Sequence, residues 1–544
     1  MMRLSIPRSA RRLLLALPLL LGCRANAQGS TPARVGTTPA STSSARKPTL
    51  VLFLTIDQFG SDYFERYGGN LTAGLRRLRD EGAVWMRGRH DHAIAETAPG
   101  HATTMSGRFP VRTGIASNSQ GVNTADAPLI GSSDAGASPF RFQGTTLFDW
   151  MRAVDPATRA LSVSRKDRGA ILPIGRARTD VYWYASNGVF TTSTYYRDTL
   201  PSWVQAFNAQ QHPLAYAGKS WTPLLSDDRY NEPDTVLIES GGRDFTFPHR
   251  LAMGRDTVFR DIRDTPWMDS LTLAFALEGV RTLGLGASAG RTDLLAVSLS
   301  STDAIGHKYG PDSKEIHDQI LRLDRYLGAF LDALFALRGT DNIVIALTAD
   351  HGVAPYPELR SPYYDNHGAQ RIDTRNAWRV AYAALKAAGM DTAAVENDDG
   401  FRVRDRAAFT RAGVDPDAIA ALWVRELRQL TGVLRADLLR DLAQADTVQD
   451  VIARRWLHML PVDGAVRAVV TPKPFGYYQG VTYATHGLPH DYDTQVPVLF
   501  WGTGIAAGRR AGEARVVDMA PTLAARLGIT PLERLDGRAL PLAP

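Results

Sequence analysis

Four stretches of the chain are continuously apolar over the length of a β-strand. They are residues 48–57, 293–303, 342–352 and 495–502, and the first reads PTLVLFLTID. A strand buried on both faces of a parallel sheet has this pattern, because neither of its faces alternates toward water. The first three stretches reach an aspartate and then a polar turn, and the fourth follows a histidine. The pattern therefore predicts four strands of one core sheet.

Between these stretches, apolar residues recur at helical spacing. Residues 70–81, 311–338 and 415–430 show this spacing. In the last of them, Asp415 is placed to cap a helix and Pro416 suits the first turn. Alternating strands and helices predict the α/β class, with a doubly wound, mostly parallel central sheet and helices on both faces.

Two stretches interrupt this alternation. Residues of about 176–265 are aromatic, rich in threonine and loop-like, and residues of about 355–480 carry a mixed αβ pattern of their own. We interpret both as insertions into one catalytic domain over residues 48–544. Residues 28–47 are rich in Ser, Thr, Pro, Ala and Gly without a periodic apolar pattern, so we expect a flexible linker there.

Residues 1–27 have the features of an export signal. Four arginines precede an apolar run at 13–22 that is too short to span a bilayer as a helix. Ala-Asn-Ala at 25–27 offers a cleavage site. As alternatives, Leu-Leu-Gly-Cys at 20–23 resembles a lipoprotein box with a lipid anchor at Cys23, and the paired arginines weakly resemble a twin-arginine signal. Each route exports the protein, so we expect a periplasmic or outer-surface location in a bacterium and no transmembrane helix in the mature chain.

Charge and cysteine content narrow the classes of function. The formal net charge is +6 over 544 residues, but five arginines and no acid lie within residues 1–27, so the rest of the chain carries +1. A nearly neutral body lacks the basic face that nucleic-acid binding needs. Because Cys23 is the only cysteine, histidine and carboxylate would have to hold any transition metal in the mature chain.

Carboxylates and imidazoles follow the predicted strands, at the sheet edge where ligands bind in open α/β folds. Each acid taken alone is more often a turn or cap residue. Together they predict two sites for divalent ions of the oxygen-and-nitrogen type that suits zinc, since such a convergence is costly to desolvate without a metal. The residues are Asp57, Asp303, His307, Asp350, His351 and His486. The other histidines are expected at the surface or behind the ligands, and they are His90, His92, His101, His212, His249, His317, His367, His458 and His490.

Thr97 stands before a Pro-Gly pair in the segment ETAPGHATTMSGRFPVRTGIASN, residues 96–118. A threonine in that position ordinarily caps the start of a helix with its hydroxyl. The alternative is that the hydroxyl is a nucleophile, which the residue alone does not decide.

Several short motifs, in this order, resemble those of the alkaline phosphatase superfamily. They are TIDQFGSDYFERY, the segment around Thr97, SRKDRGAILPIG, SSTDAIGHKYGP, TADHG and THG. Over about residues 48–540 the chain is most similar to the PafA-type, phosphate-insensitive bacterial alkaline phosphatases, close to the nucleotide pyrophosphatases and phosphodiesterases. One small departure is Ala98, where the pattern has glycine.

The resemblance implies two Zn²⁺ per chain and a phosphothreonine intermediate. Coordination to zinc would lower the pKa of the Thr97 hydroxyl and make it a nucleophile. The resemblance implies that one ion is held by Asp303, His307 and His486. It implies that the other is held by Asp57, Asp350, His351 and the Thr97 oxygen. It also implies that Asn118 contacts a phosphoryl oxygen, and that Lys166 and Arg168 are the pair that distinguishes monoesterases from diesterases.

The charge of the substrate favours a monoester. Lys166 and Arg168, two residues apart on a segment expected to be extended, would point the same way toward a dianionic phosphate. We therefore expect a hydrolase of small phosphate monoesters with secondary diesterase activity. The alternatives are a phosphodiesterase or nucleotide pyrophosphatase, and an inactive zinc-containing surface protein that binds phosphorylated ligands. A sulfatase using formylglycine made from cysteine is excluded, because position 97 is threonine and Cys23 cannot serve.

Overall fold

The computed structural model describes residues 47–543. The predicted export signal, the alternative lipid anchor at Cys23 and all but the last residue of the predicted linker lie outside these residues. None of the helices formed by residues 47–543 combines the length and the apolar character that crossing a membrane requires.

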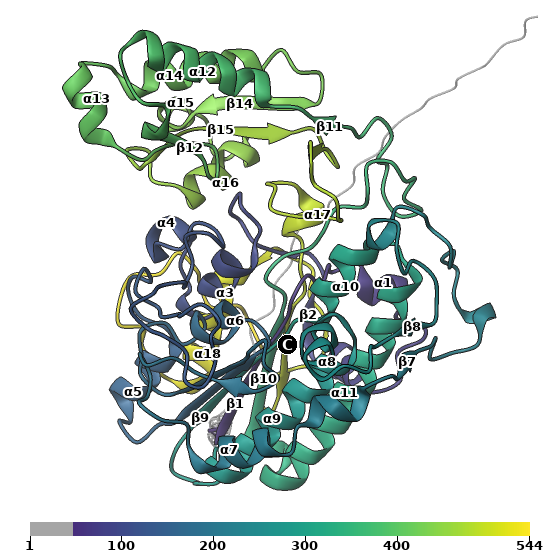
Figure 1. The fold of residues 1–544 in the computed structure, drawn as a ribbon. Coiled ribbons are helices and arrows are strands. Elements are labelled where there is room, and N and C mark those ends of the chain that lie inside the picture. The colour runs from purple at the N-terminus through teal and green to yellow at the C-terminus, as the bar shows by residue number, and fades with distance from the viewer. Residues whose placement is uncertain (1–46, 544) are drawn as a thin grey trace, which may run out of the picture. The chain divides into compact units, whose positions relative to one another are not determined.

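The described residues build a nine-stranded central sheet (Figure 1) in the order β18-β2-β17-β10-β1-β9-β4-β5-β6. The run from β10 to β5 is parallel, whereas β17 pairs with β10 and β2 in antiparallel fashion. The strands of this sheet are β1 (Leu50–Ile56), β2 (Ala83–Trp85), β4 (Ala160–Ser164), β5 (Asp180–Tyr184), β6 (Phe190–Thr191), β9 (Asp293–Leu299), β10 (Ile343–Thr348), β17 (Val498–Gly502) and β18 (Gly508–Arg509). The predicted α/β class with a mostly parallel sheet is confirmed.

Three of the predicted strands lie side by side at the centre of the sheet. Every residue of β1, β9 and β10 is buried, as expected for parallel strands covered on both faces. In the register, Thr55 of β1 lies between Thr348 of β10 and Ser298 of β9. The carboxyl ends of the three strands therefore lie at the same level, which brings the residues that follow them together.

The stretch 176–265 differs from its interpretation as an inserted loop region. Its first part forms β5 and β6, which extend the central sheet, and Tyr182, Trp183 and Tyr184 of β5 are buried. Their aromatic side chains pack among α-helices, for example Tyr182 against Phe275, so aromatic content here reflects core packing. The remainder is irregular, with α7 (Ser202–Ala209), β7 (Ser220–Trp221), β8 (His249–Arg250) and α8 (Arg255–Asp261).

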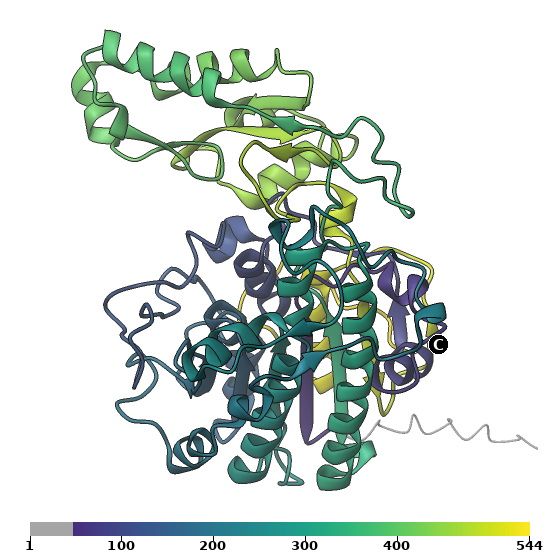
Figure 2. The same ribbon diagram turned by 45° about the vertical axis from the view of Figure 1, so that its right-hand side comes forward.

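Helices cover both faces of the central sheet (Figures 1 and 2). On one side α9 and α2 pack against α11, and on the other α3 packs against α6 and α18. These and the neighbouring helices are α1 (Tyr63–Arg66), α2 (Gly74–Glu81), α3 (Thr97–Ser106), α4 (Pro110–Thr113), α5 (Leu147–Val154), α6 (Asp167–Ile171), α9 (Trp267–Leu283), α10 (Ser301–Tyr309), α11 (Lys314–Arg338), α17 (Asp491–Thr494) and α18 (Met519–Leu527).

The predicted helices form, but two of them begin later than their patterns. The α2 helix begins at Gly74 rather than residue 70, because the Asp324 carboxylate of α11 accepts hydrogen bonds from the amides of Thr72, Ala73 and Arg76 and so fixes the turn before it. The α11 helix begins after Ser313, whose hydroxyl accepts from the amide of Ile316.

A second, smaller sheet lies within residues 355–480. Its antiparallel order is β12-β13-β15-β14, and α12 and α14 pack on it (Figure 1) around Trp378, Phe401 and Trp423. The elements are α12 (Arg375–Ala387), β12 (Val395–Asn397), β13 (Phe401–Val403), α13 (Arg406–Ala412), α14 (Pro416–Leu427), β14 (Val433–Leu438), α15 (Leu439–Leu442), α16 (Val451–Met459) and β15 (Val466–Pro472). As expected, the Asp415 carboxylate caps α14 by accepting from the amide of Asp417.

Short two-stranded pairs complete the described chain. They are β3 (Gly88–Arg89) with β19 (Ala514–Arg515), β11 (Arg371–Ile372) with β16 (Tyr477–Tyr478), and β7 with β8.

Candidate metal centre

Thr97 is the first residue of α3 and lies at the carboxyl edge of the central sheet. Its side chain is buried, and Glu96, in extended conformation, is the residue that precedes the helix. The Thr97 hydroxyl does not cap α3: its Oγ1 accepts a hydrogen bond from the Lys166 ammonium at 3.1 Å. The amide of Ala98 is instead satisfied by the side-chain oxygen of Asn118 at 2.9 Å. The capping role, the simpler interpretation of Thr97, is thus taken by another residue.

Asn118 is held in place from two directions. Its own amide donates to Oε2 of Glu96 at 2.8 Å, and its Oδ1 faces the first turn of α3. Among residues 47–543 its Nδ2 group has no hydrogen-bond partner, so both hydrogens can be donated to a ligand at the start of the helix.

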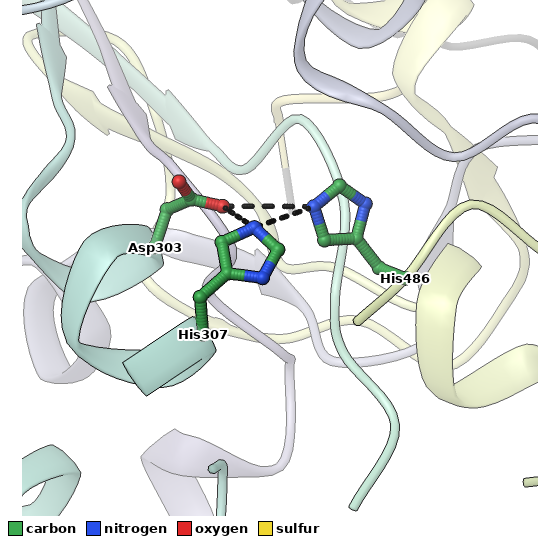
Figure 3. Close-up of side chains that lie close together, drawn as sticks. All are labelled: Asp303, His307 and His486. Carbon is green, nitrogen blue, oxygen red and sulfur yellow. Dashed lines mark hydrogen bonds and ion pairs between the residues drawn. The ribbon is translucent and has the colours of Figure 1, made fainter. Parts of the chain in front are cut away.

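The first group of candidate metal ligands comes from α10 and from the loop before α17. Asp303 and His307 are four residues apart and so share one face of α10, while His486 approaches from the loop (Figure 3). Oδ1 of Asp303 lies 3.2 Å from Nε2 of His307 and 3.6 Å from Nε2 of His486. Asp303 was expected at a strand end, but β9 already ends at Leu299 and Asp303 lies in the first turn of the following helix.

The hydrogen bonds of three histidine rings fix which ring nitrogen faces the centre of the site. Nδ1 of His307, His351 and His486 lies 2.5 to 2.9 Å from the carbonyl oxygens of Ala484, Gly352 and Ala95, respectively. A carbonyl only accepts, so each Nδ1 carries a proton, and in the neutral ring the lone pair of Nε2 points inward. The Nε2 atoms of His307 and His486 lie 3.2 Å apart. Two lone pairs facing each other at this distance are stabilised by a cation between them.

The second group comes from the ends of β1 and β10. Asp57 follows β1, and Asp350 and His351 follow β10, its neighbour in the sheet. Oδ1 of Asp57 and Nε2 of His351 are 3.4 Å apart, and both are buried without a hydrogen-bond partner within residues 47–543. An acceptor facing an acceptor in a buried position fits a divalent ion better than it fits packing.

The two groups share a ligand. Asp57, Asp303 and His351 offer ligand atoms within 4.8 Å of one another, as do Asp303, His307 and His486. Asp303 therefore belongs to both sets, which places the two candidate sites next to each other. Carboxylate oxygen with imidazole nitrogen is a donor set that suits zinc.

The Lys166 ammonium lies between these groups. Its Nζ is 2.6 Å from Oδ2 of Asp57 and 2.7 Å from Oδ2 of Asp303, in addition to its contact with Thr97. This single buried cation joins the hydroxyl to both ligand groups. Although burial favours the neutral acid, Lys166 and then His307 hold the pKa of Asp303 well below its usual range.

Burial and neighbouring charges shift the pKa values of two histidines of the site in opposite directions. Burial, reinforced by His351, lowers the pKa of His486 to about 3, so this imidazole is neutral and its lone pair is free for a metal. Burial also acts on His351, but Asp350 and Asp57 outweigh it and raise the pKa to about 9. The carboxylates therefore favour positive charge at Nε2 of His351, which a proton supplies in the absence of a metal and which a bound divalent ion would supply in its place.

Arg168 differs from its expected position. Lys166 is the residue that precedes α6, and Arg168 lies within the first turn of that helix, so the two side chains do not share one extended segment. Arg168 is partly exposed, its amide bonds to Asp167, and its guanidinium lies 3.5 Å from the same carboxylate. The expectation of an extended segment is wrong, because five residues of helix begin directly after Lys166.

Two further groups support the site, and of these only Gln58 was not anticipated from the sequence. Gln58 adopts a positive φ of 64°, donates from its amide to Asp350 and donates from its side chain to Asp303 at 3.0 Å. His101 lies one turn along α3 from Thr97, within 3.1 Å of the Asp350 carboxylate, and also bonds to Ser298. The one feature of the sequence that could have indicated the role of Gln58 is its position directly after Asp57.

Most of the other histidines are not at the surface. His90 and His101 lie behind the ligand groups, as one of the two expectations had it. His249, His317 and His490 are buried as well, and they bond to Glu315, Glu232 and the carbonyl of Pro472, respectively. A surface location is wrong for these three, because each imidazole finds a buried acceptor. His367 is exposed.

The glycine of the Pro-Gly pair lets α3 approach the second ligand group closely. A Cβ atom on Gly100 would lie 2.4 Å from the carbonyl oxygen of Asp350 and 2.7 Å from its Cβ. We expect Gly100→Ala to lower the free energy of unfolding by about 1–3 kcal/mol, since overpacking forces the backbone apart. Urea unfolding measures this. Gly69→Ala is the control, because that glycine is exposed with open space around its Cβ position. Equal effects of the two substitutions would contradict the close approach.

The chain is similar to known proteins along most of its length. The family model described as type I phosphodiesterase / nucleotide pyrophosphatase matches residues 51–435, a span that holds all the ligands named above except His486. A protein of Myroides odoratus named calcium-transporting ATPase is 30% identical over 515 residues, 89% of this chain and 92% of that protein. Alkaline phosphatase PhoK of Sphingomonas sp is 30% identical over 543 residues, 92% of each. The crystal structure of wild-type alkaline phosphatase PafA matches with a TM-score of 0.81 at 27% identity, covering 91% of this chain and 98% of that one.

Proposed function

Because the chain belongs to the type I phosphodiesterase / nucleotide pyrophosphatase family, within the alkaline phosphatase superfamily, we propose that it is a zinc-dependent phosphate monoester hydrolase that acts through a phosphothreonine at Thr97. The relatives PhoK and PafA are named alkaline phosphatases, and the similarity to each spans more than nine-tenths of this chain. Phosphomonoester hydrolysis is accordingly the class of activity. The metals, their number and the nucleophile are what the proposal adds.

The observation that carries the proposal is the position of the Thr97 hydroxyl. It lies buried at the start of α3, 3.1 Å from a lysine ammonium that itself contacts Asp57 and Asp303, one from each ligand group. A threonine with a purely structural role has no need of an ammonium that is held by two carboxylates. A threonine that attacks a phosphoryl group does need such a cation nearby, because the group carries negative charge.

The residues present fit two divalent ions. Asp303, His307 and His486 would hold one, and Asp57, Asp350, His351 and the Thr97 oxygen the other. When bound, two zinc ions supply Lewis-acid stabilisation of the attacking and leaving oxygens of an in-line displacement.

The chain's own groups account for the rest of the reaction. The Thr97 hydroxyl gives up its proton to solvent, and its Oγ1 bonds to phosphorus as the bond to the ester oxygen breaks; that oxygen takes a proton from solvent and leaves as the alcohol. A second displacement by water breaks the P–Oγ1 bond, returns a proton to Oγ1 and releases inorganic phosphate. The Nδ2 group of Asn118 donates to the nonbridging oxygens, where charge remains high in the loose transition state. The Lys166 ammonium would donate to them as well once its two carboxylate partners are engaged by bound metal. The positive end of the α3 dipole faces the same place.

The competing candidate is a phosphodiesterase or nucleotide pyrophosphatase, which the description of the family model favours. Hydrolysis of 4-nitrophenyl phosphate and of bis(4-nitrophenyl) phosphate, compared as kcat/KM, decides between the two. A larger value for the monoester supports the proposal, and a larger value for the diester overturns it.

Removing the metal is expected to remove the activity. After dialysis against a chelator, hydrolysis of 4-nitrophenyl phosphate should fall by about 100-fold or more, because the metals stabilise the charge of both oxygens, and zinc should restore it. Elemental analysis should find two zinc ions per chain in the wild type and fewer in His486→Ala. The control is His367→Ala, an exposed histidine that should leave the zinc content at two. Full activity of metal-free protein would refute the proposal.

A further inference from the structure

A cavity of about 560 Å³ opens beside the candidate metal centre. His486, one of the ligands of the first group, lines it, as do Glu96 and Gly487. Its other walls come from the smaller sheet and its helices and from β16. The cavity is therefore adjacent to the ligand group that Thr97 does not belong to, which is the side on which the ester oxygen departs in the proposed reaction.

One wall of the cavity is aromatic. Trp456 of α16 and Tyr477 and Tyr478 of β16 line it. The polar ends of these side chains are engaged elsewhere, since the Trp456 indole donates to Thr471 and the Tyr477 hydroxyl donates to the carbonyl of Ala354. Trp456 and Tyr477 are buried and support this wall from behind, whereas the partly exposed Tyr478 offers ring surface to an occupant, which suits an apolar or cationic group.

Another part of the lining, which includes the residue before Thr97, carries carboxylates. Glu96 and Asp399 both line the cavity, and Asp399 is mostly buried. The Arg402 guanidinium lies 3.1 Å from the carboxylate of Asp399 and 3.1 Å from that of Asp398, so one cation serves both. Burial, and then the charges of Asp398 and Glu96, raise the pKa of Asp399 to about 7. In this part of the lining, negative charge is in excess.

Arg375 does not neutralise the excess negative charge of these carboxylates. It lines the outer part of the cavity, but its guanidinium is exposed and pairs with both carboxylate oxygens of Asp373. An anionic occupant would thus find no unengaged arginine among the residues that form the walls, and would meet two carboxylates.

Resting on the proposed function, we propose that this cavity is the subsite for the organic group of the phosphate monoester and that it selects organic groups bearing an ammonium over those bearing a carboxylate. Ring surface together with carboxylates is the combination that binds organic cations. The same carboxylates repel an anionic organic group, which adds discrimination by disfavouring the wrong substrate.

Three monoesters with the same two-carbon skeleton test the inference. They are 2-aminoethyl phosphate, 2-hydroxyethyl phosphate and carboxymethyl phosphate, whose organic groups are cationic, neutral and anionic. Values of kcat/KM measured at pH 8, where the amine is protonated, should be highest for the aminoethyl ester and lowest for the carboxymethyl ester.

Substitution of Asp399 separates this preference from the intrinsic reactivity of the esters. In Asp399→Asn, the ratio of kcat/KM for the aminoethyl ester to that for the carboxymethyl ester should fall by about fivefold to tenfold, as expected for one charge removed from a partly buried site. The hydroxyethyl ester should be hydrolysed within about twofold of the wild-type rate. Asparagine suits this position, because residue 399 has a φ of 62°.

Asp463→Asn is the matched control, since it removes the same charge from an exposed position near the smaller sheet. It should leave the ratio unchanged. An unchanged ratio in Asp399→Asn, or an equal fall in both variants, would overturn the inference while the hydrolase activity stands. Failure of the wild type to hydrolyse any of the three esters would instead remove the proposed function, and the inference with it.

Discussion

Thr97→Ala should abolish turnover of phosphate monoesters, with kcat falling by about 10³-fold or more. The substitution removes the oxygen that the proposal places in the covalent bond to phosphorus, and residual hydrolysis would depend on the bound metals and on substrate binding alone. Thr97→Ser should retain substantial activity, because it keeps the hydroxyl. The measurement combines steady-state rates with detection of a phosphorylated enzyme after rapid acid quenching, in which the label should be found on residue 97.

Thr103→Ala provides the control for this substitution. Thr103 is a buried threonine of the same helix, and its hydroxyl donates to the carbonyl of Pro99, one of the ordinary backbone contacts of a helix interior. It should keep most of the activity. Undiminished phosphate release by Thr97→Ala would leave no role for a threonine nucleophile.

Lys166→Ala should reduce kcat/KM for a phosphate monoester by about 100-fold, and for a diester by far less. Its ammonium lies in the centre of the site, where it can interact with the second negative charge that only the monoester has. Loss of a buried hydrogen bond to a charged group costs about 1.5–3 kcal/mol, which corresponds to roughly tenfold to 150-fold. Replacing Arg168 as well should lower the monoester rate further and increase the difference between the two substrates.

The matched substitution is Lys314→Ala. Lys314 is also a buried lysine, but it pairs with Asp227 and takes no part in the ligand groups. It should change the two rates equally. If Lys166→Ala reduced the rates on 4-nitrophenyl phosphate and on its bis ester by the same factor, the assignment of Lys166 to the charge of the monoester would be refuted.

The central strands and their carboxylates could be predicted from the sequence because both follow from local patterns. A run such as LVLFLTI can be buried only when both of its faces are covered, and parallel strands bring the residues beyond them to one edge. Asp57 and Asp350 follow directly from this argument. Asp303 does so only approximately, because the pattern does not show that β9 ends at Leu299 and that a helix begins before the aspartate.

The parts that could not be predicted depend on contacts between distant segments. The α6 helix has five residues, too few for an apolar period, so Arg168 could not be distinguished from a residue of an extended segment. The roles of Gln58 and Glu96 depend on partners far away in the sequence or on a positive φ, which residue type alone does not reveal. The same holds for the buried histidines, because the acceptor of each ring lies on another element.

The ligands of the metal centre are distributed over more than four hundred residues, from Asp57 after β1 to His486 before α17. The second group is complete only at His351 and the first only at His486, so dividing the chain anywhere between β10 and His486 separates His486 from the other ligands of its group. If metal binds here as proposed, the complete centre would therefore form only after the sheet has assembled, and it would not be a seed around which a partial chain could organise.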